Sequence, residues 1–130
     1  MSEQGKAVVT KLSPWSVKDT VARLKAIVEA RGMSVFAVID LGAEAGASGF
    51  DLRDMQVITF GSTVSTAAVM AAHPLAALDV PQKVVVWVDG CETKIGYAEP
   101  PVLAARYGLA AQLAEMLAAI DTVTDAAIDK

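Results

Sequence analysis

The segment Thr59–Met70, TFGSTVSTAAVM, places one glycine and four hydroxyl side chains directly before an apolar run. The hydroxyl residues are Ser62, Thr63, Ser65 and Thr66. The start of a helix presents unpaired N–H groups and a positive dipole end, which bind phosphate or carboxylate. The alternative is a turn made by Gly61 and a helix capped by Ser65 or Thr66. The segment has no lysine and no GxxxxGK[ST] or GxGxxG pattern, so we predict a cap first and an anion site second.

Asp40 is the best single candidate for a functional carboxylate. It follows the apolar stretch Met33–Ile39, MSVFAVI. Open α/β sheets bind ligands beyond the carboxyl ends of their strands, and a partly buried carboxylate there can act as a base. The alternative role is a cap on the following Gly-Ala-Glu turn. We predict that Asp40 and the Gly61–Thr66 loop face the same hollow.

The remaining reactive side chains are few. His73, the only histidine, precedes Pro74 at a helix end, where it can shuttle a proton or complement the helix dipole. Cys91 is the only cysteine, and Asp89 and Glu92 beside it disfavour a thiolate. One histidine and one cysteine do not make an ordinary zinc site. We therefore predict no metal and no cofactor.

Tyr97 and Glu99 lie between a predicted hairpin and the last helices, where the lip of a cleft can form. A tyrosine in such a place more often packs its ring and bonds its hydroxyl locally. Tyr97 completes the predicted set of ligand-binding residues. That set is Asp40, Gly61, Ser62, Thr63, Thr66 and Tyr97.

Composition limits the classes of protein to consider. The 130 residues are 54% hydrophobic and 20% charged, with a net charge of −4. This length predicts a single domain, 1–130, with short flexible termini of about five residues at each end. The scattered basic residues argue against a nucleic-acid or anionic membrane partner. With no secretory signal, no long apolar run and one cysteine, we expect a cytoplasmic protein.

Hydrophobic periodicity predicts helices interleaved with strands. Apolar residues at Val17, Val21, Leu24 and Val28 indicate a helix that Ser16 caps and Gly32 ends. The apolar stretch Met33–Ile39 predicts a strand covered on both faces. The other predicted strands are 6–12, 55–60, 83–88 and 94–97, the last two joined by a connection longer than the tightest hairpin. The other predicted helical segments are 43–47, 66–73, a region from Pro100, and 109–120. This order predicts an α/β fold of the α+β type, a single-domain sandwich of a mixed β-sheet with packed helices.

Six segments together resemble the domain of unknown function 302 family. They are SVKDTVARL, VFAVID, ITFG, HPLAALDVPQKVVVWVD, YAEP and LAARYGL, and they cover a family-like core of 12–120. The resemblance implies a compact α/β domain that assembles as dimers in relatives, and it implies no activity. Relatives typically carry a histidine where this chain has Leu41 after Asp40. An Asp-His pair at that point is therefore half missing here.

Three functional hypotheses remain open. The first is a homodimeric module that binds a small molecule or an anion near Asp40 and the Gly61–Thr66 loop. The second is an enzyme that uses Asp40 as a general base with His73 or Tyr97 as proton donor. The third is a purely structural or interaction module whose buried surface is its dimer contact.

Overall fold

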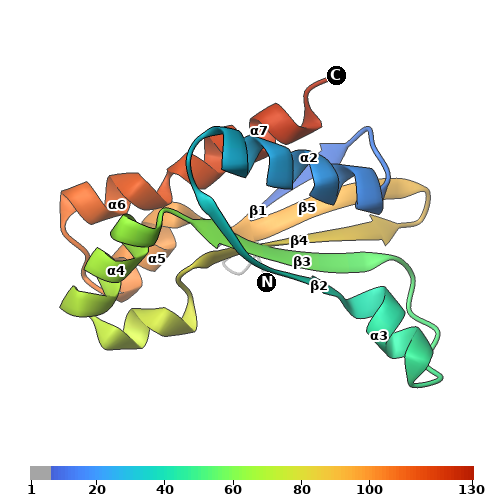
Figure 1. The fold of residues 1–130 in the computed structure, drawn as a ribbon, viewed down its shortest axis with the longest axis horizontal. Helices are drawn as coiled ribbons and strands as arrows, with labels where there is room; N and C mark the ends of the chain where they lie inside the picture. The colour runs from blue at the N-terminus through green and yellow to red at the C-terminus, as the bar shows by residue number, and fades with distance from the viewer. Residues whose placement is uncertain (1–6) are drawn as a thin grey trace.

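Five strands form one sheet in the computed structural model, which describes residues 7–130 (Figure 1). The strands are β1 (Val8–Ser13), β2 (Ser34–Asp40), β3 (Met55–Gly61), β4 (Gln82–Asp89) and β5 (Glu92–Ala98). Their order is β1-β5-β4-β3-β2, and every neighbouring pair is antiparallel. The α+β class is confirmed, but the expected mixed sheet is wrong. The chain crosses from one edge to the other between β1 and β2, so helices interleave with strands although no neighbours are parallel.

Most helices lie on one face or at one end of the sheet, and α3 lies at the opposite end (Figure 1). They are α2 (Val17–Ala30), α3 (Leu41–Ala47), α4 (Thr63–Ala72), the 3-10 helix η1 (Pro74–Leu78), α5 (Pro100–Arg106), α6 (Ala111–Leu117) and α7 (Ala119–Ile128). Helices α2 and α7 pack side by side on one face of the sheet, whereas α4, η1, α5 and α6 gather at one end. Among residues 7–130, no helix has the length and apolar character needed to cross a bilayer.

Helix α2 forms as its sequence pattern predicts. The Ser16 hydroxyl accepts a hydrogen bond from the Asp19 N–H at 3.0 Å, which satisfies a donor of the first turn. The predicted apolar stripe is buried against the sheet. Gly32 follows the helix with a φ of 76°, the left-handed geometry that glycine adopts without steric cost. Each buried valine or leucine stabilises the fold by roughly 1.5–3 kcal/mol.

The C-terminal helices differ from the prediction. In place of one helix over 109–120, the chain forms α6 and α7 with Ala118 between them. Helix α7 continues to Ile128, and Val123 and Ala127 are fully buried. The expectation that the last five residues do not pack is therefore wrong at Ala127. The stripe of Ile120, Val123 and Ala127 has helical spacing, but the polar residues between its members obscure the pattern.

A smaller apolar cluster forms at the end of the sheet where β3 ends and β4 begins. Its buried members come from α4, η1, the segment before β4, α5 and α6. They are Val69, Ala76, Val80, Leu103 and Leu117. The register pairs Phe60 of β3 with Gln82 of β4 at this end. The helical cluster therefore stands directly beside these two strand ends.

The β4–β5 hairpin is tighter than predicted. Asp89 pairs with Glu92, so the loop has only the two residues Gly90 and Cys91. Gly90 has a φ of 66°, and a glycine at the first loop position is what a type II′ hairpin turn requires. The expected longer connection is wrong, because the sequence pattern placed the start of β5 two residues too late.

We predict that Val123→Ala lowers the free energy of unfolding by about 2 kcal/mol, because it leaves a cavity beneath α7. Urea unfolding followed by circular dichroism measures the change. Leu75→Ala on η1 is the control, because Leu75 is 73% exposed, with an expected change within about 0.5 kcal/mol. Equal stability of wild type and Val123→Ala would contradict the packing of α7 described here.

Candidate functional site

The Gly61–Thr66 segment begins helix α4 three residues earlier than the sequence predicts. Ser62 is the N-cap, and its hydroxyl accepts a hydrogen bond from the Ser65 N–H at 3.2 Å. The assignment of the cap to Ser65 or Thr66 is therefore wrong, since both lie inside the helix. Gly61 has no left-handed φ. A Cβ at this position would lie 3.3 Å from the Thr66 hydroxyl. Gly61 therefore makes room for the Thr66 side chain and is not required by the backbone conformation.

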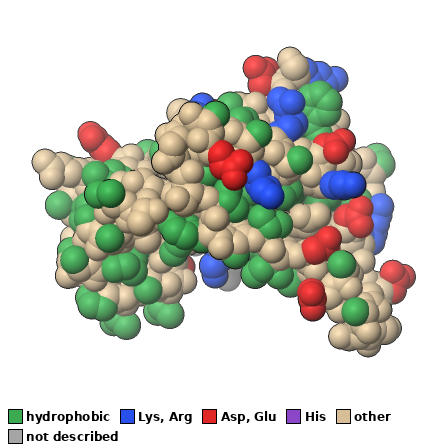
Figure 2. Space-filling view, in the orientation of Figure 1, with side chains coloured by type: hydrophobic (Ala, Val, Ile, Leu, Met, Phe, Trp, Pro, Cys, Tyr) green, Lys and Arg blue, Asp and Glu red, His purple; other side chains and the backbone are tan. Residues whose placement is uncertain are grey.

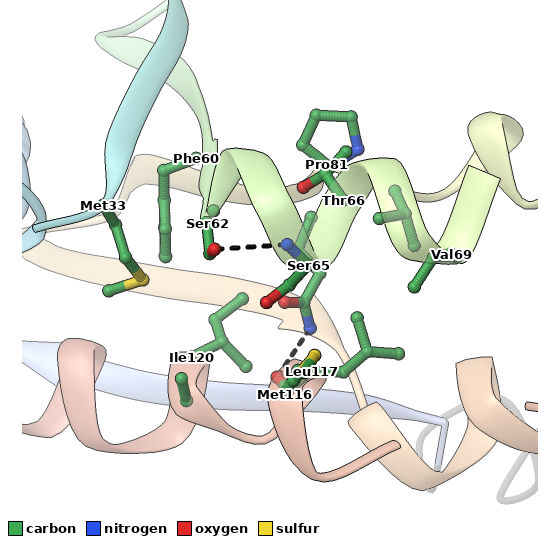
Figure 3. A pocket seen from close by; sticks show the side chains of 14 residues that line it. Met33, Phe60, Ser62, Ser65, Thr66, Val69, Pro81, Met116, Leu117 and Ile120 are labelled. Atoms are coloured by element: carbon green, nitrogen blue, oxygen red, sulfur yellow. Dashed lines mark hydrogen bonds between the residues drawn. The ribbon is translucent and has the colours of Figure 1, made fainter. Parts of the chain in front are cut away.

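A pocket of about 220 Å³ lies between the start of α4 and the α6–α7 junction (Figure 3). Its lining comprises Met33, Phe60, Gly61, Ser62, Ser65, Thr66, Val69, Val80, Pro81, Gln82, Met116, Leu117, Ala119 and Ile120. The side chains of α4 face those of Met116, Leu117 and Ile120 across the space. No lining residue is charged. On the face drawn in Figure 2, few charged side chains lie over this end of the molecule.

The polar groups of the pocket are hydroxyls and one amide. Ser62 is engaged as the helix cap. Within residues 7–130, the hydroxyls of Ser65 and Thr66 make no hydrogen bond to another protein group. The buried Gln82 donates a hydrogen bond from Nε2 to the Leu117 carbonyl at 2.9 Å. The pocket can therefore offer hydrogen bonds to a neutral group, while most of its wall is apolar.

Asp40 lies far from this pocket. In the antiparallel β2–β3 pair, Asp40 is opposite Gln56 and Ser34 is opposite Gly61. Strands rise about 3.3 Å per residue, so roughly 20 Å of strand separates the two positions. The prediction that Asp40 and the Gly61–Thr66 loop face one hollow is wrong. It assumed that successive strands end at the same edge, which holds for parallel neighbours only.

Asp40 instead caps helix α3. Its Oδ1 accepts a hydrogen bond from the Ala43 N–H at 2.9 Å, and its Oδ2 lies 3.5 Å from the Gln56 amide nitrogen. The side chain is exposed. The structure thus matches the alternative in which Asp40 holds a local turn.

Thr63 also lies outside the pocket lining. It is the exposed first residue of α4, and its hydroxyl is 3.3 Å from that of Ser34. Of the six predicted ligand-binding residues, three line the pocket, namely Gly61, Ser62 and Thr66.

Comparisons with known proteins agree on the family. The model of the family described as "Domain of unknown function DUF302" matches residues 9–127. The chain belongs to the DUF302 family. A crystal structure titled as an uncharacterized conserved DUF302 protein from Bacillus stearothermophilus has a TM-score of 0.77 to this chain at 22% identity. It covers 95% of this chain and 96% of its own, so the two share their fold.

Three curated relatives are Brucella proteins named as fluoride-specific ion channels. The FluC 1 proteins of Brucella suis and Brucella abortus and the FluC 2 protein of Brucella melitensis are each 32% identical over 103 residues. The match covers 78% of this chain but 41% or 38% of those proteins. The DUF302 chain therefore spans about two fifths of the curated relatives that it matches.

Tyr97 lies beneath α7 in this DUF302 domain, outside the pocket. Its hydroxyl donates to Asp121 Oδ1 at 2.5 Å. Lys11 of β1 donates from Nζ to Thr124 Oγ1 at 2.7 Å and to Asp125 Oδ1 at 2.8 Å, joining the same helix to the sheet edge. Burial and the hydrogen bond to Asp121 raise the pKa of Tyr97. The cluster holds α7 on the sheet, as the local alternative for Tyr97 foresaw.

The groups of the enzyme hypothesis do not converge. Asp40 is on β2 and Tyr97 on β5, three strand spacings apart in the sheet. At about 4.7 Å per spacing they are separated by roughly 14 Å, well beyond a shared proton transfer. His73 is exposed at the end of α4, at the opposite end of β3 from Asp40. Within residues 7–130, no group of three histidine, cysteine, aspartate or glutamate side chains is placed to hold a metal.

Gln82 is the pocket residue that sequence reasoning missed. Strand β4 alternates between faces, so Gln82 points to the same side as the buried Val84 and Val86. The alternation of Gln82 with Val84 and Val86 is therefore a sequence pattern that predicts a buried amide at this strand end. Met33, Met116 and Ala119 carry no such signal, because Met33 lies before β2 and the other two lie in α6 and α7, and only tertiary packing brings them to one pocket.

Asp79 ties η1 to α5 beside the pocket. Its Oδ2 accepts a hydrogen bond from the Tyr107 hydroxyl and one from Arg106 Nη1, the latter at 2.8 Å. The Tyr107 hydrogen bond, and after it the hydrogen bond and charge of Arg106, hold the pKa of Asp79 below its ordinary value.

We predict that Asp79→Asn lowers the free energy of unfolding by about 1 kcal/mol at pH 7, because two hydrogen bonds lose their charged acceptor. A carboxylate with a lowered pKa stabilises the fold above its unfolded-state pKa, and this stabilisation is lost as the pH falls through the folded-state value. The difference between wild type and variant should therefore shrink below pH 3.8. Urea unfolding at a series of pH values measures it, with the exposed Asp51→Asn as control. A difference that persists at the lowest pH would contradict this role of the charge.

Proposed function

We propose that this DUF302 chain is a homodimeric module that binds a small, neutral, mostly apolar molecule carrying one hydrogen-bonding group. The observation that supports it is the pocket at the start of α4, whose wall is apolar and whose Ser65 and Thr66 hydroxyls make no hydrogen bond within residues 7–130. Ligand sites of this kind combine an apolar lining with a few oriented polar groups. The single, exposed Cys91 is in keeping with a cytoplasmic module.

The size of the pocket limits the ligand. A cavity of about 150 Å³ is enough for benzene. The pocket of about 220 Å³ therefore suits a substituted ring or a short alkyl chain. Two thioethers, from Met33 and Met116, line it, and methionine adapts its shape to different apolar partners.

A second candidate is the binding of a small anion at the start of α4. This candidate is favoured by the Brucella relatives, which are named as fluoride-specific ion channels. It also agrees with the general affinity of helix N-termini for anions. The lining of the pocket provides no cation, and Ser62 already satisfies one N–H of the first turn. We therefore place the neutral ligand first.

Phenol is a suitable probe, and filling the pocket should weaken its binding. We expect phenol to raise the melting temperature of the wild type in a concentration-dependent way. Ala119→Leu places a larger side chain in the pocket and should weaken binding at least about tenfold. Ala118→Leu adds the same atoms at the neighbouring exposed position and should bind phenol as the wild type does. Isothermal titration calorimetry measures the affinities.

The same titrations separate the candidate functions. Sodium fluoride and sodium phosphate, against sodium chloride at equal ionic strength, test the anion candidate. A response to fluoride or phosphate without one to phenol would overturn the neutral ligand in favour of the anion. Equal phenol affinity in Ala119→Leu and wild type would show that phenol binds elsewhere and would contradict the pocket.

Thr66→Val should separate the polar and apolar parts of recognition. The substitution keeps the shape of the side chain but removes the hydroxyl beside Gly61. We expect about fivefold weaker binding of phenol, the equivalent of one hydrogen bond, and unchanged binding of toluene. The exposed Thr63→Val is the matched control. Equal weakening for phenol and toluene would mean that Thr66 acts only through packing.

A further inference from the structure

Strand β2 is an edge strand that leaves large apolar side chains uncovered. It pairs with β3 alone, so its other edge has no partner within residues 7–130 (Figure 1). Phe36, Val38 and Ile39 are 44%, 39% and 45% exposed. No residue from Met33 to Ile39 is charged.

This burial disagrees with the sequence of the strand. The run MSVFAVI has the composition of a strand covered on both faces. Monomeric proteins usually protect an edge strand with lysine, proline or a bulge, because unpaired N–H and C=O groups recruit further strands. Strand β2 has one such device, a bulge at Phe36, and the run Ala37–Asp40 remains regular. A second strand beside β2 would resolve the disagreement.

We infer that β2 pairs antiparallel with β2 of a second copy of this chain, about a two-fold axis near Val38. The inference rests on the homodimer of the proposed function and names its interface. The two sheets then continue as one sheet of ten strands, with the α2–α7 layers of both copies on the same face.

Charge favours a second copy in the antiparallel direction. Asp40 and Glu44 stand at one end of β2, whereas Arg31, just before the other end, donates from Nη1 to Thr122 of α7 at 2.8 Å. All three are exposed. Antiparallel pairing of two copies keeps their acidic ends apart, whereas parallel pairing would bring those ends together. Avoidance of like charges sets the orientation of the strands more than their affinity.

The apolar ends of the strand are also complementary. Phe50, 67% exposed, lies in the loop after α3 at the Asp40 end. Val64, 79% exposed, lies in the first turn of α4, which the Ser34–Thr63 contact holds beside the start of β2. Antiparallel pairing places Phe50 of each copy at the end where its partner carries Val64.

The exposed aromatic rings near β2 provide part of the area that a dimer interface needs. At about 150–250 Å² per aromatic ring, the exposed parts of Phe36 and Phe50 offer roughly 200 Å² per copy. A stable, specific interface buries about 800 Å² per partner. The two rings supply about a quarter of this area, and the strand and the neighbouring ends of α3 and α4 must supply the rest.

Sedimentation velocity over roughly 1–200 µM tests the interface. The wild type should change from monomer to dimer within this range. Ile39→Lys places a charge at the centre of the pairing and should weaken association at least about tenfold. Leu75→Lys on η1 is the matched control, because Leu75 is 73% exposed and lies away from β2. Thermal melting verifies that both variants fold, and Phe36→Lys is the second variant if Ile39→Lys does not.

Crosslinking provides the second measurement. In a Cys91→Ser background, Ala37→Cys should form a covalent dimer with a short bismaleimide, whereas the exposed Ala71→Cys on α4 should not. A wild type that stays monomeric at every concentration overturns both the interface and the homodimer, with phenol binding unaffected. If Leu75→Lys disrupts the dimer and Ile39→Lys leaves it intact, the β2 interface is wrong but the homodimer is not.

Discussion

The packing of α2 and α7 on one face of the sheet is the interaction on which the rest of the structure depends. Ile58, Phe60, Val84, Val86 and Ile95 are all buried beneath these two helices. One helix comes from the first quarter of the chain and the other from its last residues, so the core closes only when the two ends meet. Arg23 of α2 adds a hydrogen bond from Nε to the Ala127 carbonyl at 2.7 Å.

The pocket exists because two apolar cores meet without filling the space between them. Ile120 belongs to the main core and Leu117 to the smaller one, and both line the pocket. Gln82 holds the chain at this junction through the Leu117 carbonyl. The shape of the pocket therefore depends on how α6 and α7 pack against the sheet more than on the start of α4.

Particular elements show how far sequence reasoning reaches. Helix α2 could be predicted with its cap, its apolar stripe and its terminal glycine, because each signal acts within about one turn. The cap role of Asp40 could be stated for the same reason. Helix α7 could not be predicted, since its apolar stripe is sparse. The start of α4 was misplaced because Ser62, Ser65 and Thr66 have similar capping ability, and only the strand end at Gly61 selects among them.

The sequence by itself determined the order of the elements, the α+β class and the uncharged character of the segment from Met55 to Leu78. Local periodicity, caps and composition express these properties directly. Only the tertiary structure decided that Asp40 and Gly61 lie at opposite ends of the β2–β3 pair and that β2 is an uncovered edge. The reason is that strand direction and partner follow from the global packing of helices on the sheet, and a strand's own residues are compatible with more than one arrangement.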